Sequence, residues 1–250
     1  MVITSQEILA EMFRLVSAAE ARNIQIRAIG GLAVQAHNKS KHSLFMREFA
    51  DLDFVVAKKQ RREFESFMPE AGYSPNKQFN LLNGSERQIY NDNKTDMKVD
   101  IFVGDFEMCH KIPLEERLKF DPVTIPLAEL FLSKSQIVEL NHKDMLDIAS
   151  LLFNNETGED DTEKINLKIV AQLCSQDCGL YKTTSINLER VEEFVGKQTG
   201  FSQEERDIVF GRIHSIQKRL EDMPKPIAWK LRDRVGARVK WYIEVEEVDR

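Results

Sequence analysis

Two aspartates one residue apart, Asp51 and Asp53, constrain the fold of this chain more than any other feature. Side chains alternate between the faces of a strand, so both carboxylates point to the same side, roughly 7 Å apart along the backbone. The apolar residues 54–57 follow the pair, so the acids lie where the strand begins and its remainder enters a core. Two anions this close repel each other, which favours a cation between them. Oxygen-only ligands suit Mg²⁺ or Mn²⁺, which also bind substrate phosphates.

A glycine pair, Gly30-Gly31, separates a short apolar strand in residues 24–29 from a helical pattern that reaches His37. Glycine permits unusual dihedral angles and close approach of the backbone. A helix that starts there would point backbone N–H groups at an anion such as a phosphate. Most glycine pairs at such positions only turn the chain, so both interpretations stay open for this motif taken alone.

A third acid, Asp100, lies in the middle of the apolar residues 97–103. A carboxylate inside an apolar strand is costly unless it is paired or binds a metal. Taken alone, Asp100 can be an edge-strand acid that faces water or pairs with Lys98. Together with the glycine turn and the acid pair, it completes the parts needed for metal-assisted phosphoryl or nucleotidyl transfer, in which Asp100 helps to activate the attacking hydroxyl.

The order Gly-Gly, Asp-x-Asp and distal Asp resembles the nucleotidyltransferase superfamily with the DNA-polymerase-β-like fold. Residues 125–152 resemble its AbiEii-type branch, which carries a helix-borne lysine followed by Lys-Asp-x-x-Asp-Ile at a helix start. The resemblance covers about residues 24–153. It implies metal binding by Asp51, Asp53 and Asp100, nucleotide contacts from Gly30, Gly31 and Arg47, a triphosphate contact from Lys134, and a site bordered by Lys143, Asp144 and Asp147.

Other readings of the same region follow from the residues. Asn141 can be the N-cap of a helix, with Asp144 in its first turn, where an acid complements the helix dipole. The segment 38–46 looks like an inserted loop, and Phe49 stands where the family often has a threonine. These departures leave the metal ligands alone and leave the surface that contacts base and acceptor open.

The bulk composition bounds the class of protein. The 250 residues are 42% hydrophobic and 30% charged, as in an ordinary globular chain. No apolar run approaches the length of a membrane span, and the N-terminus lacks the pattern of a signal peptide. Three cysteines do not suggest a disulfide framework, so we expect a cytoplasmic protein. The formal charge of −6 argues against sequence-independent wrapping of nucleic acid.

Periodicity predicts both strands and helices over residues 1–155 and an all-helical domain over residues 156–250, and hence an α+β protein. The resemblance implies that residues 1–155 form a mixed-sheet nucleotidyltransferase domain. Capping boxes are expected at Thr4–Glu7 and Ser202–Glu205. The alternating residues around Asn83-Gly84 predict a β-hairpin. We interpret the polar, acidic residues 154–162 as the linker between the domains. Helical patterns are expected at residues 5–19, 60–71, 165–174, 188–195, 203–220 and 227–242.

The last of these helical patterns is basic. Lys230, Arg234 and Arg238 recur at four-residue spacing, and six basic residues stand against one acid between Pro224 and Lys240. Such a stripe can bind the phosphate backbone of an RNA acceptor. It can also be a solvated face whose cations pair with the acids of residues 244–247.

The leading hypothesis is a Mg²⁺- or Mn²⁺-dependent nucleotidyltransferase that moves a nucleoside monophosphate from an NTP to a hydroxyl and releases pyrophosphate. By resemblance, the acceptor is RNA (a tRNA end in particular), a protein or a small molecule. Resemblance also suggests the toxin of a toxin–antitoxin pair, with an antitoxin protein as partner. The alternative is a non-catalytic nucleotide- or RNA-binding module on the same fold. A phosphatase with an Asp-x-Asp nucleophile ranks lower, because it needs the acids at the C-terminal end of a parallel strand.

Overall fold

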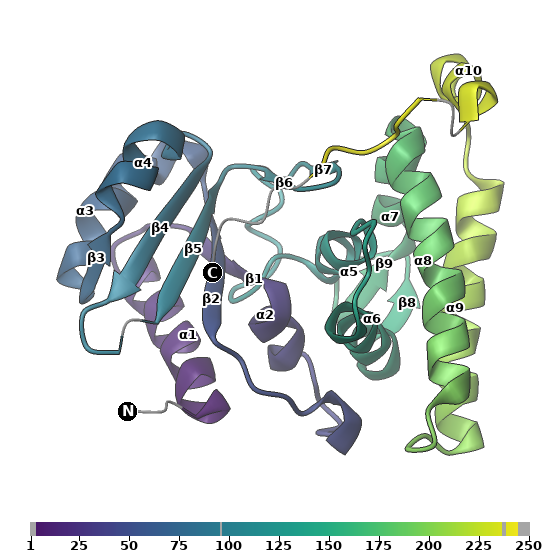
Figure 1. The fold of residues 1–250 in the computed structure, drawn as a ribbon, viewed down its shortest axis with the longest axis horizontal. Coiled ribbons are helices and arrows are strands. Elements are labelled where there is room, and N and C mark those ends of the chain that lie inside the picture. Colours follow the sequence, from purple (N-terminus) through teal and green to yellow (C-terminus); the bar gives the residue numbers. More distant parts are fainter. Residues whose placement is uncertain (1–3, 96, 237–238, 245–250) are drawn as a thin grey trace. The chain divides into compact units, whose positions relative to one another are not determined.

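The computed structural model describes residues 4–95, 97–236 and 239–244. Contacts within the chain divide it into two compact units. The first comprises Met1–Phe106 with Pro113–Pro126, and the second comprises Glu107–Ile112 with Leu127–Arg250. Figure 1 labels the elements of both units, which are described separately below.

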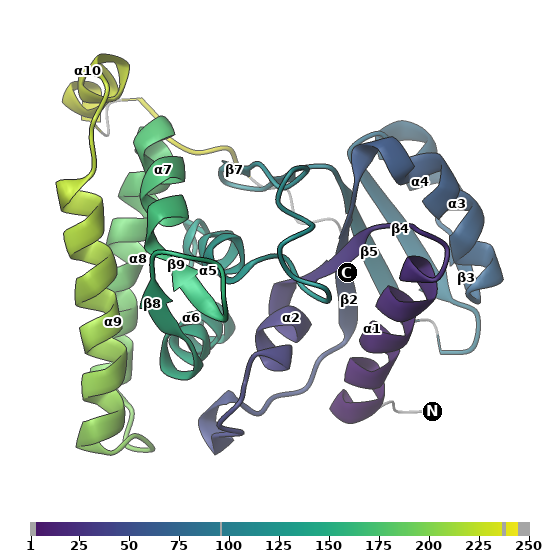
Figure 2. The ribbon, with the colours of Figure 1, turned by 180° about the vertical axis from the view of Figure 1, so that it is seen from behind.

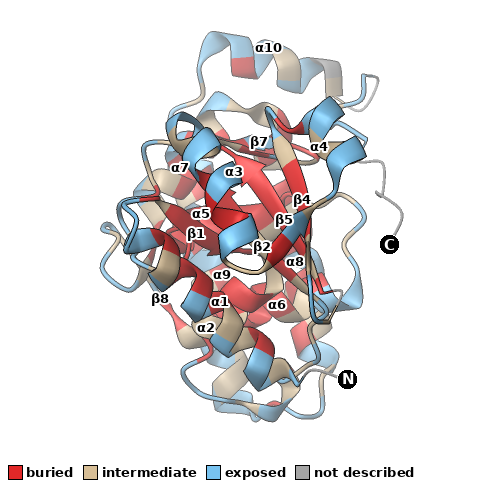
Figure 3. Cartoon of the chain, turned by 90° about the vertical axis from the view of Figure 1, so that its left-hand side faces the viewer, coloured by how far each residue is buried: buried red, intermediate tan, exposed pale blue. Residues whose placement is uncertain are grey.

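A five-stranded mixed sheet forms the centre of the first unit. Its strands are β1 (Ile26–Ile29), β2 (Asp51–Val56), β3 (Tyr73–Pro75), β4 (Arg87–Asp92) and β5 (Lys98–Val103). The strand order is β1-β2-β5-β4-β3; β2 and β5 run parallel, and the other neighbours run antiparallel. Strands β2 and β5 are therefore interior, and Figure 3 shows how much of the sheet is buried.

The helices of the first unit are α1 (Ser5–Glu20), α2 (Gly30–Ala36), η1 (Ser43–Phe45), η2 (Lys58–Gln60), α3 (Arg61–Glu70) and α4 (Lys77–Asn83). Helix α1 begins with the predicted capping box of Thr4 and Glu7. Helices α1 and α3 lie side by side on the sheet, as Figure 2 shows. An ion pair between Arg22 and Glu70 joins their ends. This packing covers one face of the sheet.

The predicted hairpin around Asn83-Gly84 is wrong, because residues 77–83 form helix α4. The side chain of Asn76 caps this helix by accepting a hydrogen bond from the Phe79 N–H at 3.1 Å. The Asn80 side chain accepts from the Ile89 N–H at 2.7 Å and donates to the Ile89 carbonyl at 3.1 Å, so it ties β4 to the helix. Gly84 has φ −63°, whereas a type I′ hairpin turn needs positive φ. Side-chain capping therefore outweighs the turn preference of Asn-Gly here.

Helices dominate the second unit, which confirms the predicted α+β class with a helical C-terminal region. They are α5 (Leu127–Ser135), α6 (His142–Asn154), α7 (Leu167–Gln176), α8 (Cys178–Lys197), α9 (Gln203–Asp222) and α10 (Ile227–Val235). Helix α5 is buried along nearly its whole length and contacts α6, α7 and α8. Helix α9 starts with the predicted capping box of Ser202 and Glu205. Within the described part of the chain, no helix is both long and apolar enough to cross a membrane.

The second unit is not purely helical. It contains the short strands β7 (Lys111–Ile112), β8 (Glu156–Gly158) and β9 (Lys164–Asn166), and β6 (Phe106–Glu107) begins at the last residue before its first segment. Strands β8 and β9 pair in parallel, so residues 154–162, interpreted from sequence as a linker, lie inside this unit. Helices α5 and α6 precede that stretch and pack with the later helices. The two compact units are defined by contacts within the chain, whereas the boundary predicted after residue 155 separates domains that fold independently. That boundary stays a prediction.

The last helix is shorter than the sequence pattern predicts. Helix α10 ends at Val235, and Gly236 follows with φ +59°, a conformation that interrupts a helix. Arg232 donates hydrogen bonds to the carbonyls of Val239 and Lys240 at 2.8 and 3.1 Å. This arginine therefore stabilises the end of the helix. Arg238, the third cation of the predicted stripe, lies outside the described residues.

Candidate active site

The three aspartates singled out from the sequence meet on two neighbouring strands of the first unit. Asp51 and Asp53 lie two residues apart on β2, and Asp100 is the register partner of Asp53 on the parallel strand β5. Register partners and i, i+2 neighbours share a face of a sheet, so all three carboxylates project to the same side. Asp51 and Asp53 are half-buried, whereas Asp100 is only 5% exposed. The result is a cluster of three acids at the amino end of β2.

The glycine turn lies directly against this cluster. Ile29, the last residue of β1, pairs with Asp53, and Gly30 follows it with φ +76°. A Cβ atom at Gly30 would overlap the carboxylate of Asp53, and one at Gly31 would overlap the guanidinium of Arg47. The pair is therefore glycine because side chains of the site itself approach the backbone here.

Arg47 reaches the same turn from the loop that precedes β2. Its guanidinium lies 4.3 Å from the centroid of the Phe49 ring, a cation–π contact. Its backbone carbonyl accepts a hydrogen bond from Ser5 at 3.1 Å, which ties the loop to the start of α1. The structure thus brings together the six predicted site residues of the first unit: Gly30, Gly31, Arg47, Asp51, Asp53 and Asp100.

Asp100 has a partner that the sequence analysis missed. Arg87 on β4 binds it as a fork: Nε donates to Oδ1 at 2.8 Å, and Nη2 donates to Oδ2. The alternative of an edge-strand acid paired with Lys98 is wrong, since β5 is interior and Lys98 stands beside Asp51. The available signal was the period-2 pattern of residues 87–92, which puts Arg87 on the same face as Ile89.

The donor set of β2 fits a divalent cation. Asp51 and Asp53 supply half-buried carboxylate oxygens on one face, which is the chemistry that Mg²⁺ and Mn²⁺ prefer. Asp100 is a weaker candidate for a third ligand, because both of its oxygens accept hydrogen bonds from the positively charged Arg87 guanidinium. In keeping with this, residues 4–95, 97–236 and 239–244 contain no group of three or more His, Cys, Asp or Glu side chains that could hold a metal ion.

The predicted residues of the second unit form a separate charged cluster. The Nζ of Lys134, near the end of α5, lies 2.9 Å from Oδ2 of Asp147 and 3.6 Å from Oδ1 of Asp144. The three side chains are 12%, 6% and 12% exposed, respectively. Lys134 is therefore an almost buried cation shared by two carboxylates of α6.

The helix start next to this cluster follows the capping interpretation. Asn141 is the N-cap of α6, and its side chain accepts from the N–H groups of Lys143 and Asp144 at 2.9 and 3.0 Å. Asp144 lies in the first helical turn, where a negative charge complements the dipole. Lys143 is exposed. These positions account for the Lys-Asp-x-x-Asp pattern by helix capping and ion pairing, whatever else the residues do.

Comparison with known proteins adds a family to this geometry. A family model described as an uncharacterised nucleotidyltransferase matches residues 2–146. No curated protein matches the chain. Among solved structures, it is similar to an antigenic nucleotidyltransferase-like protein from Paracoccidioides brasiliensis, at 14% identity, with 73% of this chain and 94% of that chain covered and a TM-score of 0.40.

A structural likeness at this TM-score says nothing about individual site residues. The matching family model does not name the AbiEii-type branch, so membership of that branch stays a prediction. The matched segment, however, spans more than half of the chain and contains the glycine turn, Arg47 and all three aspartates. The chain belongs to this family of uncharacterised nucleotidyltransferases.

Proposed function

We propose that this protein is a Mg²⁺-dependent nucleotidyltransferase (Mn²⁺ can replace Mg²⁺) that moves a nucleoside monophosphate from an NTP to a hydroxyl acceptor. Family membership over residues 2–146 supports the reaction class. The observation that carries the proposal is the register of the parallel strands, which sets Asp53 beside Asp100 with Asp51 two residues away. A protein that only folds gains nothing from three neighbouring acids, because like charges disfavour one another.

The reaction forms one bond and breaks one. The acceptor oxygen attacks the α-phosphorus, the bond from that phosphorus to the bridging oxygen of pyrophosphate breaks, and the hydroxyl loses its proton. A bound Mg²⁺ supplies neutralisation of phosphate charge and orientation of the substrate. In this proposal Asp51 and Asp53 hold the metal. Asp100 completes the site as a ligand or as the base that takes the hydroxyl proton.

Nucleotide phosphates are assigned to the glycine turn and to Arg47. The guanidinium of Arg47 lies against Gly31, next to the carboxylate of Asp53 at Gly30. Arginine is well suited to phosphate because its planar fork donates two parallel hydrogen bonds. By the AbiEii-type resemblance alone, Lys134, Lys143 and Asp144 of the second unit are proposed to contact a nucleotide.

The acceptor is proposed to be RNA that binds at α10. Lys230 and Arg234 are exposed on this helix, and Ile227 and Leu231 expose 78% and 56% of their surface. Cations beside exposed apolar side chains suit a phosphate backbone with unstacked bases. A protein or small-molecule acceptor and a toxin role with an antitoxin partner rest on resemblance alone.

One observation favours a second function, a non-catalytic nucleotide- or RNA-binding module. Arg87 occupies both oxygens of Asp100, and the described residues contain no three-ligand metal group. A module that binds nucleotide without turnover would need no third ligand. This candidate predicts nucleotide binding without release of pyrophosphate.

The test supplies Mg²⁺, each α-labelled NTP and either bulk RNA or bulk protein to the wild type and to Asp51→Ala/Asp53→Ala. Transfer predicts covalent label on an acceptor and a loss on the order of a thousandfold in the double variant. Asp92→Asn is the matched control: this acid ends β4 in the same unit and accepts locally from Thr95. Nucleotide binding without label transfer or pyrophosphate, across all acceptors, would instead support the binding module.

A further inference from the structure

Arg87 and Asp100 form a fork-shaped ion pair at the aspartate cluster. It uses two of the guanidinium nitrogens and both carboxylate oxygens. The Asp100 side chain is 8% exposed and that of Arg87 is 29% exposed, so the pair is largely withdrawn from water. Fork-shaped Arg–carboxylate pairs are among the stronger hydrogen-bonded contacts in proteins. A cation that is to bind Asp100 must compete with this arginine.

The pairing of β4 with β5 places Arg87 beside Asp100 of the aspartate cluster. Asp100 is paired with Ile89 across the antiparallel ladder, and Arg87 is paired with Phe102. Arg87 thus reaches Asp100 diagonally on the same face of the sheet. Its guanidinium also lies 5.2 Å from the centroid of the Phe102 ring. Both contacts hold the arginine at the edge of the acid cluster.

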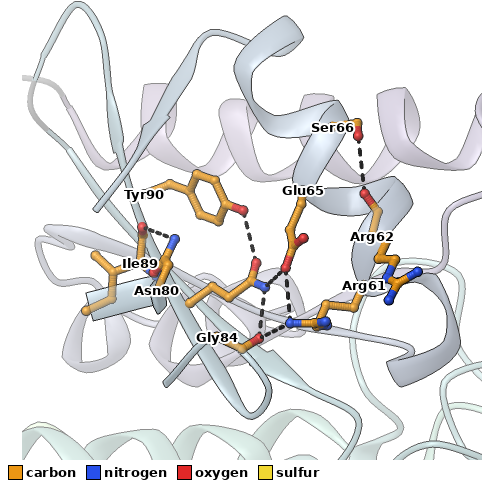
Figure 4. A network of polar contacts seen from close by, with 9 residues as sticks. Arg61, Arg62, Glu65, Ser66, Asn80, Gly84, Ile89 and Tyr90 are labelled. Carbon is orange, nitrogen blue, oxygen red and sulfur yellow. Dashed lines mark hydrogen bonds and ion pairs between the residues drawn. The ribbon is translucent and has the colours of Figure 1, made fainter. Parts of the chain in front are cut away.

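On the opposite face of β4, a network of hydrogen bonds fixes the position of the strand (Figure 4). Gln88, only 1% exposed, donates to Glu65 of α3 at 2.7 Å and to the Gly84 carbonyl at 3.0 Å, and accepts from the Tyr90 hydroxyl at 3.0 Å. Arg61 donates to the same Gly84 carbonyl at 3.2 Å. A slip of β4 by one residue would break these bonds and turn Arg87 away from Asp100. The position of Arg87 is therefore built into the fold.

Asp53 is the register partner of Asp100 on the neighbouring strand β2. A divalent cation bound between these two carboxylates would therefore compete with Arg87 for the negative charge of Asp100.

We propose that Arg87 competes with the divalent cation for Asp100 and so sets the metal affinity of the aspartate cluster. This inference rests on the proposed function and adds a positioning residue to it. When Arg87 holds Asp100, its positive charge and its two hydrogen bonds weaken the binding of a cation by that carboxylate. Without Arg87, Asp100 binds the cation together with the two carboxylates of β2 at full strength.

Competition and a purely structural ion pair differ in one measurable quantity. If the pair is purely structural, loss of Arg87 changes metal affinity by the same amount whether residue 100 is Asp or Asn. Competition predicts that loss of Arg87 tightens metal binding only when the Asp100 carboxylate is present. A neighbouring charge changes the proton affinity of a carboxyl by roughly ten- to a thousandfold, so we expect Arg87→Gln to tighten Mn²⁺ binding by at least about tenfold.

The experiment measures free Mn²⁺ by electron paramagnetic resonance during titration of the full chain, without nucleotide or acceptor. The variants are Arg87→Gln, Arg87→Lys, Asp100→Asn and Arg87→Gln/Asp100→Asn. Arg87→Gln should bind more tightly than the wild type, and Arg87→Lys should lie between them because lysine cannot form the fork. The double variant should lose the gain, since the gain comes from Asp100.

Two further variants and readouts keep the outcome decisive. Arg61→Gln is the matched control, because Arg61 is a partly buried arginine of the same unit on the Gln88 face of the sheet, and its Mn²⁺ affinity should equal that of the wild type. Circular dichroism melts check that each variant folds. If Arg87→Gln does not fold, Arg87→Lys and the neutral double variant carry the comparison.

The result that overturns the inference is a folded Arg87→Gln or Arg87→Lys that binds Mn²⁺ no more tightly than the wild type. Its failure is separable from failure of the proposed function. Label transfer by the wild type together with unchanged Mn²⁺ affinity in Arg87→Gln would support the transferase function and refute the competition by Arg87. Tighter Mn²⁺ binding by Arg87→Gln without label transfer to any acceptor would support the competition and refute the transferase function.

Discussion

Two clusters of lysine or arginine with aspartate, one in each unit, use similar residues in opposite ways. In the second unit Lys134 lies between Asp144 and Asp147, and all three side chains are nearly buried. In the first unit Asp51 and Asp53 are half-buried at the start of β2, and Asp100 accepts both hydrogen bonds of the Arg87 fork. We call the nearly buried cluster of the second unit the closed cluster, and the aspartates of the first unit, which we propose bind a cation, the open cluster. Substitutions in the closed cluster of the second unit should therefore lower the stability of the fold. Substitutions in the open cluster of the first unit should lower the transfer activity.

The largest effect is expected from Asp51→Asn in the open cluster. Loss of one metal-binding carboxylate should lower the rate of label transfer on the order of a thousandfold, which corresponds to about 4 kcal/mol of transition-state stabilisation. The free energy of unfolding should change by less than about 0.5 kcal/mol, as for a partly exposed side chain outside the core. Transfer assays and urea denaturation of the same preparation measure both. A large loss of stability with normal transfer would reverse the comparison.

Lys134→Met tests the closed cluster. Removal of the cation leaves two nearly buried carboxylates without their shared partner, so the free energy of unfolding should fall by about 3–5 kcal/mol. Lys143→Met, an exposed lysine nine residues away in the sequence, is the matched control and should be nearly neutral. Urea denaturation at neutral pH measures the difference. If Lys134→Met keeps its stability and loses NTP binding instead, the lysine contacts the triphosphate as the AbiEii-type resemblance implies.

Gly30→Ala sharpens the boundary of the open cluster. Alanine at φ +76° is strained by about 1–3 kcal/mol, and its Cβ would also overlap the Asp53 carboxylate, so both stability and transfer should fall. Gly211→Ala in α9 is the opposite case, because an added Cβ meets open space there and alanine favours a helix by about 0.8–1 kcal/mol. Thermal melts and transfer assays compare the two. Wild-type transfer activity in Gly30→Ala would show that the glycine turn is not part of the active site.

The open cluster was largely predictable from sequence, for a physical reason. Asp51 and Asp53 share a face because the strand has a period of two, and this periodicity is local. The capping boxes at Thr4 and Ser202 are local in the same way and are confirmed. Asp100 was located as an acid inside an apolar strand, although its pairing opposite Asp53 is set by the sheet.

Arg87 was missed because its role depends on non-local register. It meets Asp100 only because β4 lies antiparallel to β5 with Ile89 opposite the acid. The expected hairpin at Asn83-Gly84 obscured this arrangement, since helix α4 stands where its first strand was placed. The Asn80 side chain, which binds both backbone groups of Ile89, decides between the two structures, and no local preference encodes that contact.

The smallest effect concerns a third charged contact, also in the second unit. Asp177 caps α8 by accepting from the N–H groups of Gly179 and Leu180, and its Oδ2 lies 3.4 Å from Nδ1 of the buried His110. Burial raises the pKa of the Asp177 carboxyl, but the hydrogen bonds from His110 and from the two backbone groups outweigh it, so the pKa lies below the ordinary value of 3.8. If internally satisfied charges stabilise this unit, acid should reveal the contribution of Asp177.

The sign follows from proton linkage. As pH falls, the unfolded chain protonates Asp177 first, near its ordinary pKa of 3.8, so this contribution is complete above that pH and is lost as pH falls through the lower folded pKa. Asp177→Asn keeps a good N-cap and removes the charge. The free energy of unfolding of this variant, measured by urea denaturation between pH 3 and 7, should fall less steeply than that of the wild type below about pH 4. The difference between the two slopes should correspond to the binding of at most about one proton on unfolding. An acid profile identical to that of the wild type would show that the ionised Asp177 carboxylate adds nothing to the stability of the second unit.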